Sequence, residues 1–154
     1  LIYCDAALFH RQRLTDECHA FSPPIYERMS RGLELTGVDY AAAMRFKETW
    51  MRTIANVFDD VDMILSPTTP VPALPLEDAP NLHELTRRAA SLTYAGSIAS
   101  IPGLSIPCGF TDGGLPIGLM LQAAWWYDPL LLQAGCAYQA VTAWHERRVG
   151  LVQA

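Results

Sequence analysis

The side chains that could carry chemistry are scattered along this 154-residue sequence, and their spacing completes no catalytic or metal-binding pattern. There is no Gly-rich phosphate-binding loop, no Gly-x-Ser-x-Gly turn and no His-Glu-x-x-His helix. Cys18 and His19 are adjacent, but neighbouring residues on a helix point roughly 100° apart, which disfavours shared metal binding. We therefore expect no resident metal ion and no cofactor. The remaining histidines are isolated: His10, His83 and His145.

Two other features leave alternatives open. Asp59, Asp60 and Asp62 could bind a hard cation, but they lack the ligand spacing of a known loop and are interpreted as a solvated helix end. Cys108 could be a nucleophile if its thiol were activated. Its alternation with Ile106 places it on the apolar face of a strand, which favours a packing role.

Composition excludes several classes of protein. The chain is 51% hydrophobic and 18% charged, which fits a single folded domain rather than a disordered chain. A net charge of −5 argues against a nucleic-acid surface, and no apolar run approaches the ~18 residues that cross a membrane. Arg87 and Arg88 are interpreted as a solvated helix face, with anion binding as the alternative.

The ends of the chain and its cysteines also carry information. The four cysteines form no Cys-x-x-Cys pair, which predicts reduced thiols and a cytoplasmic protein. The first residue is Leu1 rather than Met, and its helix pattern begins without an N-cap. We therefore expect the chain to be part of something longer.

Helical patterns dominate the first half. Helices are expected over residues 1–21, 25–35 and 36–61, the last opening with Thr36 as N-cap and Asp39 three residues on. Its apolar stripe, which includes Phe46, Trp50 and Ile54, predicts core packing. Residues 62–66 predict a short strand buried on both faces, and the proline-rich segment 66–75 predicts an extended loop.

The second half adds a hairpin between two helices. A helix is expected to open at Asn81. Residues 104–110 and 117–123 then predict two strands joined by a turn at 111–114, and Pro107 makes the first of them an edge strand. The last helix is expected to be capped by Asp128 and to hold Arg147 and Arg148 in its final turn before Gly150.

Four motifs in this order resemble the amidase signature family. Residues 58–70, FDDVDMILSPTTP, are similar to the family's helix that leads into a D-x-L-x-x-P-T-x-P strand and loop. Residues 100–110, SIPGLSIPCGF, are similar to G-x-P-A-x-S-x-P-C-G, and residues 114–119, GLPIGL, to G-L-P-I-G-L-Q. Upstream, Arg31-Gly32, Asp39-Tyr40, Ala43 and Arg45 resemble the family's R-x-x-x-G, D-Y and A-x-x-R helical region.

The resemblance implies the C-terminal third of an amidase. The family attacks an amide with a serine that is activated through a second serine, in a cis peptide, and a lysine. This chain has no Ser-Ser pair, and its only lysine, Lys47, lies in a helix that the family places after the catalytic region. No catalytic residue is carried over, so the chain alone is expected to be inactive.

Departures from the family pattern favour a hydrolytic branch. Ser97 stands at a usual Asn, Ser100 at a usual Gly and Met120 at a usual Gln. Ala90 stands where the glutamyl-tRNA amidotransferase A-type branch has an acidic residue that helps to hold the glutamine amide. The resemblance therefore implies hydrolysis of small or aliphatic amides or ureas rather than transamidation.

The resulting prediction is an α/β fold that forms the C-terminal flank of the family's α/β/α sandwich, with helices on a small mixed sheet of about three strands. Residues 1–154 are expected to form a single domain, with a helical half at 1–61 and a strand-loop-helix half at 62–154. Expected partners are the missing N-terminal catalytic part or a second copy, with a small amide as substrate and neither nucleic acid nor membrane. A non-catalytic module that completes a partner chain, and an unrelated small α/β binding domain, are the alternatives. Four residues are expected to line the substrate pocket: Thr68, Thr69, Ser97 and Ser100.

Overall fold

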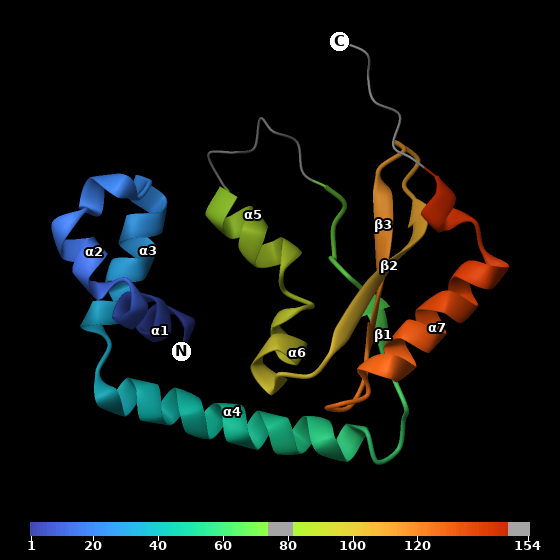
Figure 1. Cartoon of the computed structure of the whole chain (residues 1–154), viewed down its shortest axis with the longest axis horizontal. Helices are drawn as coiled ribbons and strands as arrows, with labels where there is room; N and C mark the ends of the chain where they lie inside the picture. The colour runs from blue at the N-terminus through green and yellow to red at the C-terminus, as the bar shows by residue number, and fades with distance from the viewer. Residues whose placement is uncertain (74–81, 148–154) are drawn as a thin grey trace, which may run out of the picture. The chain divides into compact units, whose positions relative to one another are not determined.

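The computed structural model describes residues 1–73 and 82–147. The chain divides into two compact units, Leu1–Thr49 and Trp50–Ala154, and each is described by itself. The single-domain expectation, with its division after residue 61, stays a prediction. Helices and a small three-stranded sheet confirm the predicted α/β class (Figure 1).

The first unit is helical. It contains α1 (Ile2–Phe9), α2 (Arg11–Asp16), a 3-10 turn (Cys18–Ala20), α3 (Pro23–Glu34) and the first part of α4 (Gly37–Val57). The continuous helix predicted over 1–21 is wrong, because the backbone leaves the helical conformation at His10 and again at Glu17. Gly32 lets α3 approach α1 closely, since a Cβ at that position would collide with the backbone carbonyl of Tyr3.

The N-terminus of α4 confirms the predicted capping arrangement. The Thr36 backbone N–H donates to Asp39 Oδ2 at 2.9 Å, and the Asp39 N–H donates to Thr36 Oγ1 at 3.1 Å. The side-chain and backbone hydrogen bonds from Thr36 hold the pKa of the Asp39 carboxyl below its ordinary value. The helix ends at Val57, and of its apolar stripe only Ile54 is buried. Core packing is therefore the wrong prediction for Phe46, which is 61% exposed.

The sheet of the second unit consists of β1 (Ile64–Pro67), β2 (Gly103–Phe110) and β3 (Pro116–Gln122), in the order β1-β3-β2 with both pairs antiparallel. The predicted hairpin is confirmed, since Phe110 pairs with Pro116 and Gly114 adopts φ +79° in the turn. Strand β2 is an edge strand, as Pro107 predicts, and its register shifts between Pro107 and Gly109. Strand β1 is the other edge, and Leu65 is 59% exposed, so the prediction of burial on both faces is wrong.

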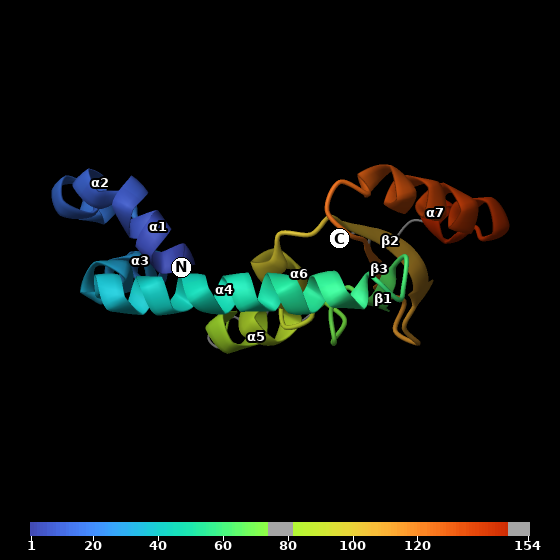
Figure 2. The ribbon, with the colours of Figure 1, turned by 90° about the horizontal axis from the view of Figure 1, so that it is seen from below.

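Helix α7 (Asp128–Val141) covers one face of this sheet (Figures 1 and 2). The core beneath it comprises Ile106, Leu121, Ala123 and Leu131. Gly135 sets the close approach, because a Cβ there would lie 2.9 Å from Leu104 Cδ2.

The last helix starts and ends earlier than predicted. Asp128 is its first residue rather than its N-cap. The helix ends at Val141 because Thr142 is extended, and a 3-10 turn (Trp144–Glu146) follows. Arg147 therefore lies outside α7, with its guanidinium 4.4 Å from the centre of the Phe110 ring. Arg148 and Gly150 fall outside the described residues.

Helices α5 (Leu82–Ala89) and α6 (Tyr94–Ala99) complete the second unit. The predicted N-cap Asn81 lies outside the described residues. Two tryptophans anchor α6 through their indole N–H groups: Trp50 donates to the Ala95 carbonyl at 2.9 Å, and Trp125 donates to the Ala99 carbonyl at 3.0 Å. Among the described residues, no helix has the length and apolar character needed to cross a membrane.

Candidate functional site

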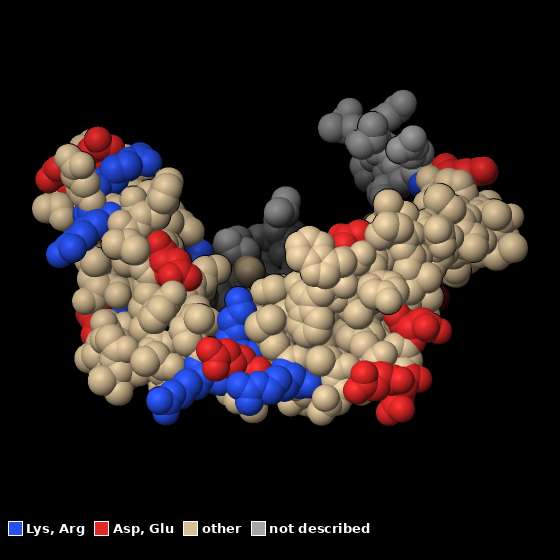
Figure 3. Space-filling view, turned by 60° about the horizontal axis from the view of Figure 1, so that its bottom comes forward, with Lys and Arg blue, Asp and Glu red and all other residues tan. Residues whose placement is uncertain are grey.

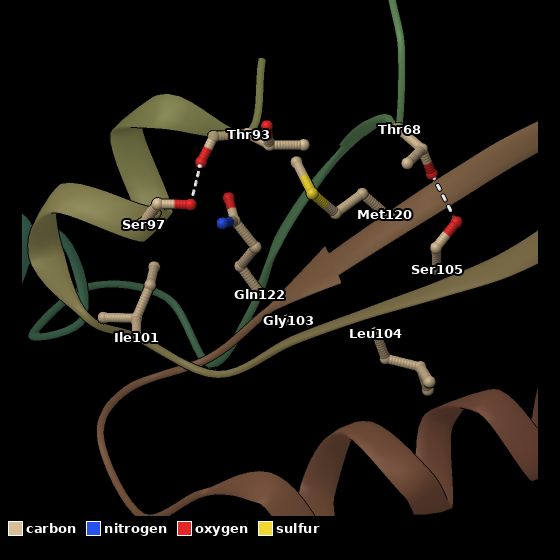
Figure 4. Close-up of a pocket in the computed structure, with 10 residues that line it drawn as sticks. Thr68, Thr93, Ser97, Ile101, Gly103, Leu104, Ser105, Met120 and Gln122 are labelled. Atoms are coloured by element: carbon tan, nitrogen blue, oxygen red, sulfur yellow. Dashed lines mark hydrogen bonds between the residues drawn. The ribbon is translucent and has the colours of Figure 1, made fainter. Parts of the chain in front are cut away.

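A cavity of about 310 Å³ lies between α6 and the face of the sheet opposite α7 (Figure 4). Antiparallel pairing determines which side chains reach it, because residues on neighbouring strands that pair in register point to the same face. Ser66, Met120 and Ser105 form one such row, and Gln122 belongs to the next. The cavity is lined by Thr68, Thr93, Gly96, Ser97, Ile101, Gly103, Leu104, Ser105, Met120 and Gln122.

Two hydroxyl groups meet at one end of the cavity. Thr68 Oγ1 and Ser105 Oγ lie 2.6 Å apart, and either can be the donor (Figure 4). The backbone N–H of Thr68 donates to the Gly118 carbonyl at 2.8 Å, which fixes the loop against β3. Gly118 is required beneath them, because a Cβ there would lie 2.7 Å from Thr68 Oγ1. The pair uses one hydroxyl hydrogen internally and leaves the other for a ligand.

The floor of the cavity is formed by two buried side chains of β3. Met120 is 6% exposed and Gln122 is 9% exposed. They share a face because they are two residues apart on a strand. The Gln122 amide packs directly against Gly96, where a Cβ would collide with Nε2. Among the described residues, none forms a hydrogen bond with this amide, which points toward α6 in Figure 4.

The α6 wall supplies polar groups whose donors are already used. Ser97 Oγ donates to the Thr93 carbonyl at 2.9 Å, and Thr93 Oγ1 donates to the Ala90 carbonyl at 2.9 Å. Their oxygens can still accept a hydrogen bond from a ligand. The helix ends at Ser100, which adopts the left-handed conformation (φ 57°, ψ 36°).

The four residues predicted to line a substrate pocket separate in the structure. Thr68 and Ser97 lie on opposite sides of the cavity (Figure 4). Ser100 lines a different hollow of about 290 Å³, beside Trp125 and Trp126. Thr69 Oγ1 donates to the Val71 carbonyl at 2.7 Å, and Thr69 lines neither space. Contact with a substrate stays a prediction for all four, and the end of the predicted loop, at Pro75, lies outside the described residues.

Sequence reasoning missed Gln122 and Ser105. Both lie in runs that were interpreted for their apolar residues. The available signal was alternation, which places Gln122 on the same face as Met120 and opposite to Leu121.

The arrangement is suited to binding rather than to nucleophilic attack. A serine needs a base that removes its proton. Ser105 is paired with a hydroxyl and Ser97 with a carbonyl, and neither partner is a base. The Cys108 thiol donates to the Ile117 carbonyl at 3.5 Å. In the described ranges no group of three acidic, histidine or cysteine side chains could hold a metal ion, so the site's chemistry is neutral hydrogen bonding.

Comparisons with known proteins agree on one family. A family model described as Amidase matches residues 13–132. An amidase from Pseudomonas putida is 28% identical over 160 residues, covering 97% of this chain and 33% of that protein. A glutamyl-tRNA(Gln) amidotransferase polypeptide from Synechococcus sp. is 35% identical over 143 residues, covering 88% of this chain and 27% of that protein. A solved amidase structure superposes with a TM-score of 0.80 at 27% identity, covering 92% of this chain and 33% of that one. The chain thus spans about a third or less of the length of these proteins.

Proposed function

Because this chain belongs to the amidase family, we propose that it is the C-terminal part of an enzyme that hydrolyses a carbon–nitrogen amide bond. The observation that carries the proposal is the family match over residues 13–132 in a chain that spans about a third of its relatives. The nucleophile and its base would then belong to the remaining two-thirds. The cavity beneath α6 would supply one wall of the substrate site.

The polar lining of this cavity supports a substrate-facing role. Thr68 and Ser97 come from loop and helix positions on either side, and Ser105 adds a hydroxyl from β2. Binding sites commonly combine an apolar floor with a few convergent polar groups. Thr69 and Ser100 are proposed as more distant contributors, since each lies outside the cavity itself.

We further propose that the parent enzyme is a hydrolase rather than a transamidase. Ala90 offers no carboxylate where the amidotransferase branch has one. Relatives of both kinds match the chain, so the proposal depends on this position and on the uncharged lining of the cavity.

Exposed apolar side chains support a partner. On α7, Leu132 is 61% exposed and Val141 is 81% exposed, while nearby Trp126 is 91% exposed. Figure 3 shows the surface over α7 with few charged side chains. Patches of this kind mark protein contacts in soluble proteins. The proposed occupant is the catalytic part of the enzyme, with self-association and a purely structural module as the alternatives.

The test begins with the chain alone. Loss of both nucleophile and base costs on the order of 10⁶ in rate in triad hydrolases, so turnover of aryl and aliphatic amides should be undetectable. A fluorophosphonate probe should label no serine. Stoichiometric labelling, or turnover that is lost on mutation of the labelled serine, would contradict the proposal.

Complementation separates the remaining alternatives. A second chain that carries the serine-rich region of the family should bind this one and restore amide hydrolysis. Binding without hydrolysis would favour the structural module. Light scattering that finds a stable dimer indifferent to the second chain would favour self-association.

The proposed location is the cytoplasm. All four cysteines are free: Cys4, Cys18, Cys108 and Cys136. Unpaired thiols persist in reducing compartments, which supports the proposal.

A further inference from the structure

We propose that the cavity beneath α6 recognises a neutral carboxamide or urea group, which pairs through two hydrogen bonds with the side-chain amide of Gln122. The inference deepens the proposed function, on which it rests, by naming the class of substrate that the site accepts. It concerns binding to this chain and requires no turnover.

Gln122 is the only member of the lining that is both deeply buried and offers a whole unused amide among the described residues. Its side chain is 9% exposed, and no described residue hydrogen-bonds to its carboxamide. Buried polar groups are almost always paired, so an unpaired one in a cavity indicates an absent partner. A carboxamide presents one acceptor and two donors in a plane. Another amide, or a urea, matches that pattern with a donor and an acceptor side by side.

The lining also selects against charge. None of the ten residues around the cavity carries an ionisable acidic or basic side chain. An ion that entered would lose its water without gaining a counter-charge, which is strongly unfavourable. Carboxylate products and zwitterionic amino-acid amides such as glutamine are therefore excluded in favour of neutral amides.

The remaining lining fits the rest of such a ligand. The Met120 side chain offers an apolar surface for a short hydrocarbon chain, and its flexibility tolerates variation in shape. The Thr68–Ser105 pair can turn its free hydroxyl hydrogen toward a carbonyl oxygen or its lone pairs toward an N–H. A volume of about 310 Å³ holds a small ligand.

The first experiment uses the unmodified chain. Butyramide, butyrate and glutamine are titrated against ¹⁵N-labelled protein, and backbone shifts are followed. Butyramide should shift the resonances of residues around Gln122 in a saturable manner, and butyrate and glutamine should not. Equal binding of butyrate, or no saturable response to butyramide, would overturn the proposal without any variant.

Two substitutions test the role of Gln122 directly. Gln122→Met keeps the length and removes both hydrogen bonds, so butyramide affinity should fall about tenfold. Gln133→Met, on the exposed surface of α7, is the matched control and should leave the affinity unchanged. Gln122→Glu should weaken butyramide and gain binding of the cationic analogue butyramidine. Undiminished butyramide binding by both Gln122 variants, each shown to be folded by its thermal midpoint, would overturn the proposal.

The two proposals can fail separately. Selective amide binding with no activity on complementation would retain this inference and reject the hydrolase. Restored hydrolysis with no Gln122 effect on binding would retain the hydrolase and reject this inference.

Discussion

Replacement of Gly96 by alanine should separate ligand binding from stability. Gly96 lies in the third position of α6, directly above the Gln122 amide. A Cβ at this position would collide with Gln122 Nε2 and lie 3.1 Å from Cδ and 3.5 Å from Ile101 Cγ1. The colliding atom is the end of a side chain rather than backbone, so the amide can move aside while the helix stays in place.

The energies of this change nearly cancel. Alanine gains about 1 kcal/mol over glycine inside a helix. Forcing Gln122 away from its preferred rotamer costs about 0.5–1.5 kcal/mol. The free energy of unfolding should therefore stay within about 1 kcal/mol of the parent value. The displaced amide can no longer meet a ligand in one plane, and loss of two neutral hydrogen bonds corresponds to about a tenfold weaker dissociation constant for butyramide.

Urea denaturation and the butyramide titration measure the two quantities on the same sample. Gly37→Ala is the control, because no atom lies within 4 Å of a Cβ placed there, at the start of α4. The control should bind butyramide as the parent does. Parent-like affinity in the Gly96→Ala variant would refute the reasoning about the amide, and a loss of several kcal/mol in stability would refute the claim that only a side chain moves.

Three further predictions concern stability. Ser100→Gly should raise the free energy of unfolding by about 1 kcal/mol in urea denaturation, because Ser100 holds φ 57°, which glycine adopts without strain. Leu131→Ala should lower it by about 2–5 kcal/mol, because Leu131 is 3% exposed in the core, whereas Leu132→Ala at an exposed site should change it by less than about 0.5 kcal/mol. The depressed pKa of Asp39 means that its stabilising effect is complete above the unfolded value of about 3.9 and is lost as the pH falls through the folded pKa. Circular dichroism across this range should show the loss, and Asp39→Asn should abolish this part of the pH dependence.

Local signals in the sequence predicted the local features of the fold. Thr36 and Asp39 are three residues apart, and their reciprocal hydrogen bonds form as expected. The turn at 111–114 and the edge position of Pro107 followed from backbone chemistry that needs no distant partner.

Features that depend on distant packing were predicted less well. The exposure of Leu65 depends on β1 being at the edge of the sheet, which the sequence of β1 does not encode. Arg147 was assigned to a helix end by its charge, but its stacking on Phe110 depends on where β2 ends. Gln122 was missed for a related reason, since only the register of β3 and the position of Gly96 identify its amide as part of a cavity.

The strand order β1-β3-β2 has a consequence for folding during synthesis. The central strand, β3, is the last of the three to leave the ribosome, and residues 68–115 separate it from β1. Ile64–Pro67 therefore emerges with neither of its strand-pairing edges satisfied and waits for β3 to close a long loop. Nascent chains that stop between β1 and β3 should expose an apolar strand and depend on chaperones, whereas chains extended past Gln122 can complete the whole sheet in one cooperative step.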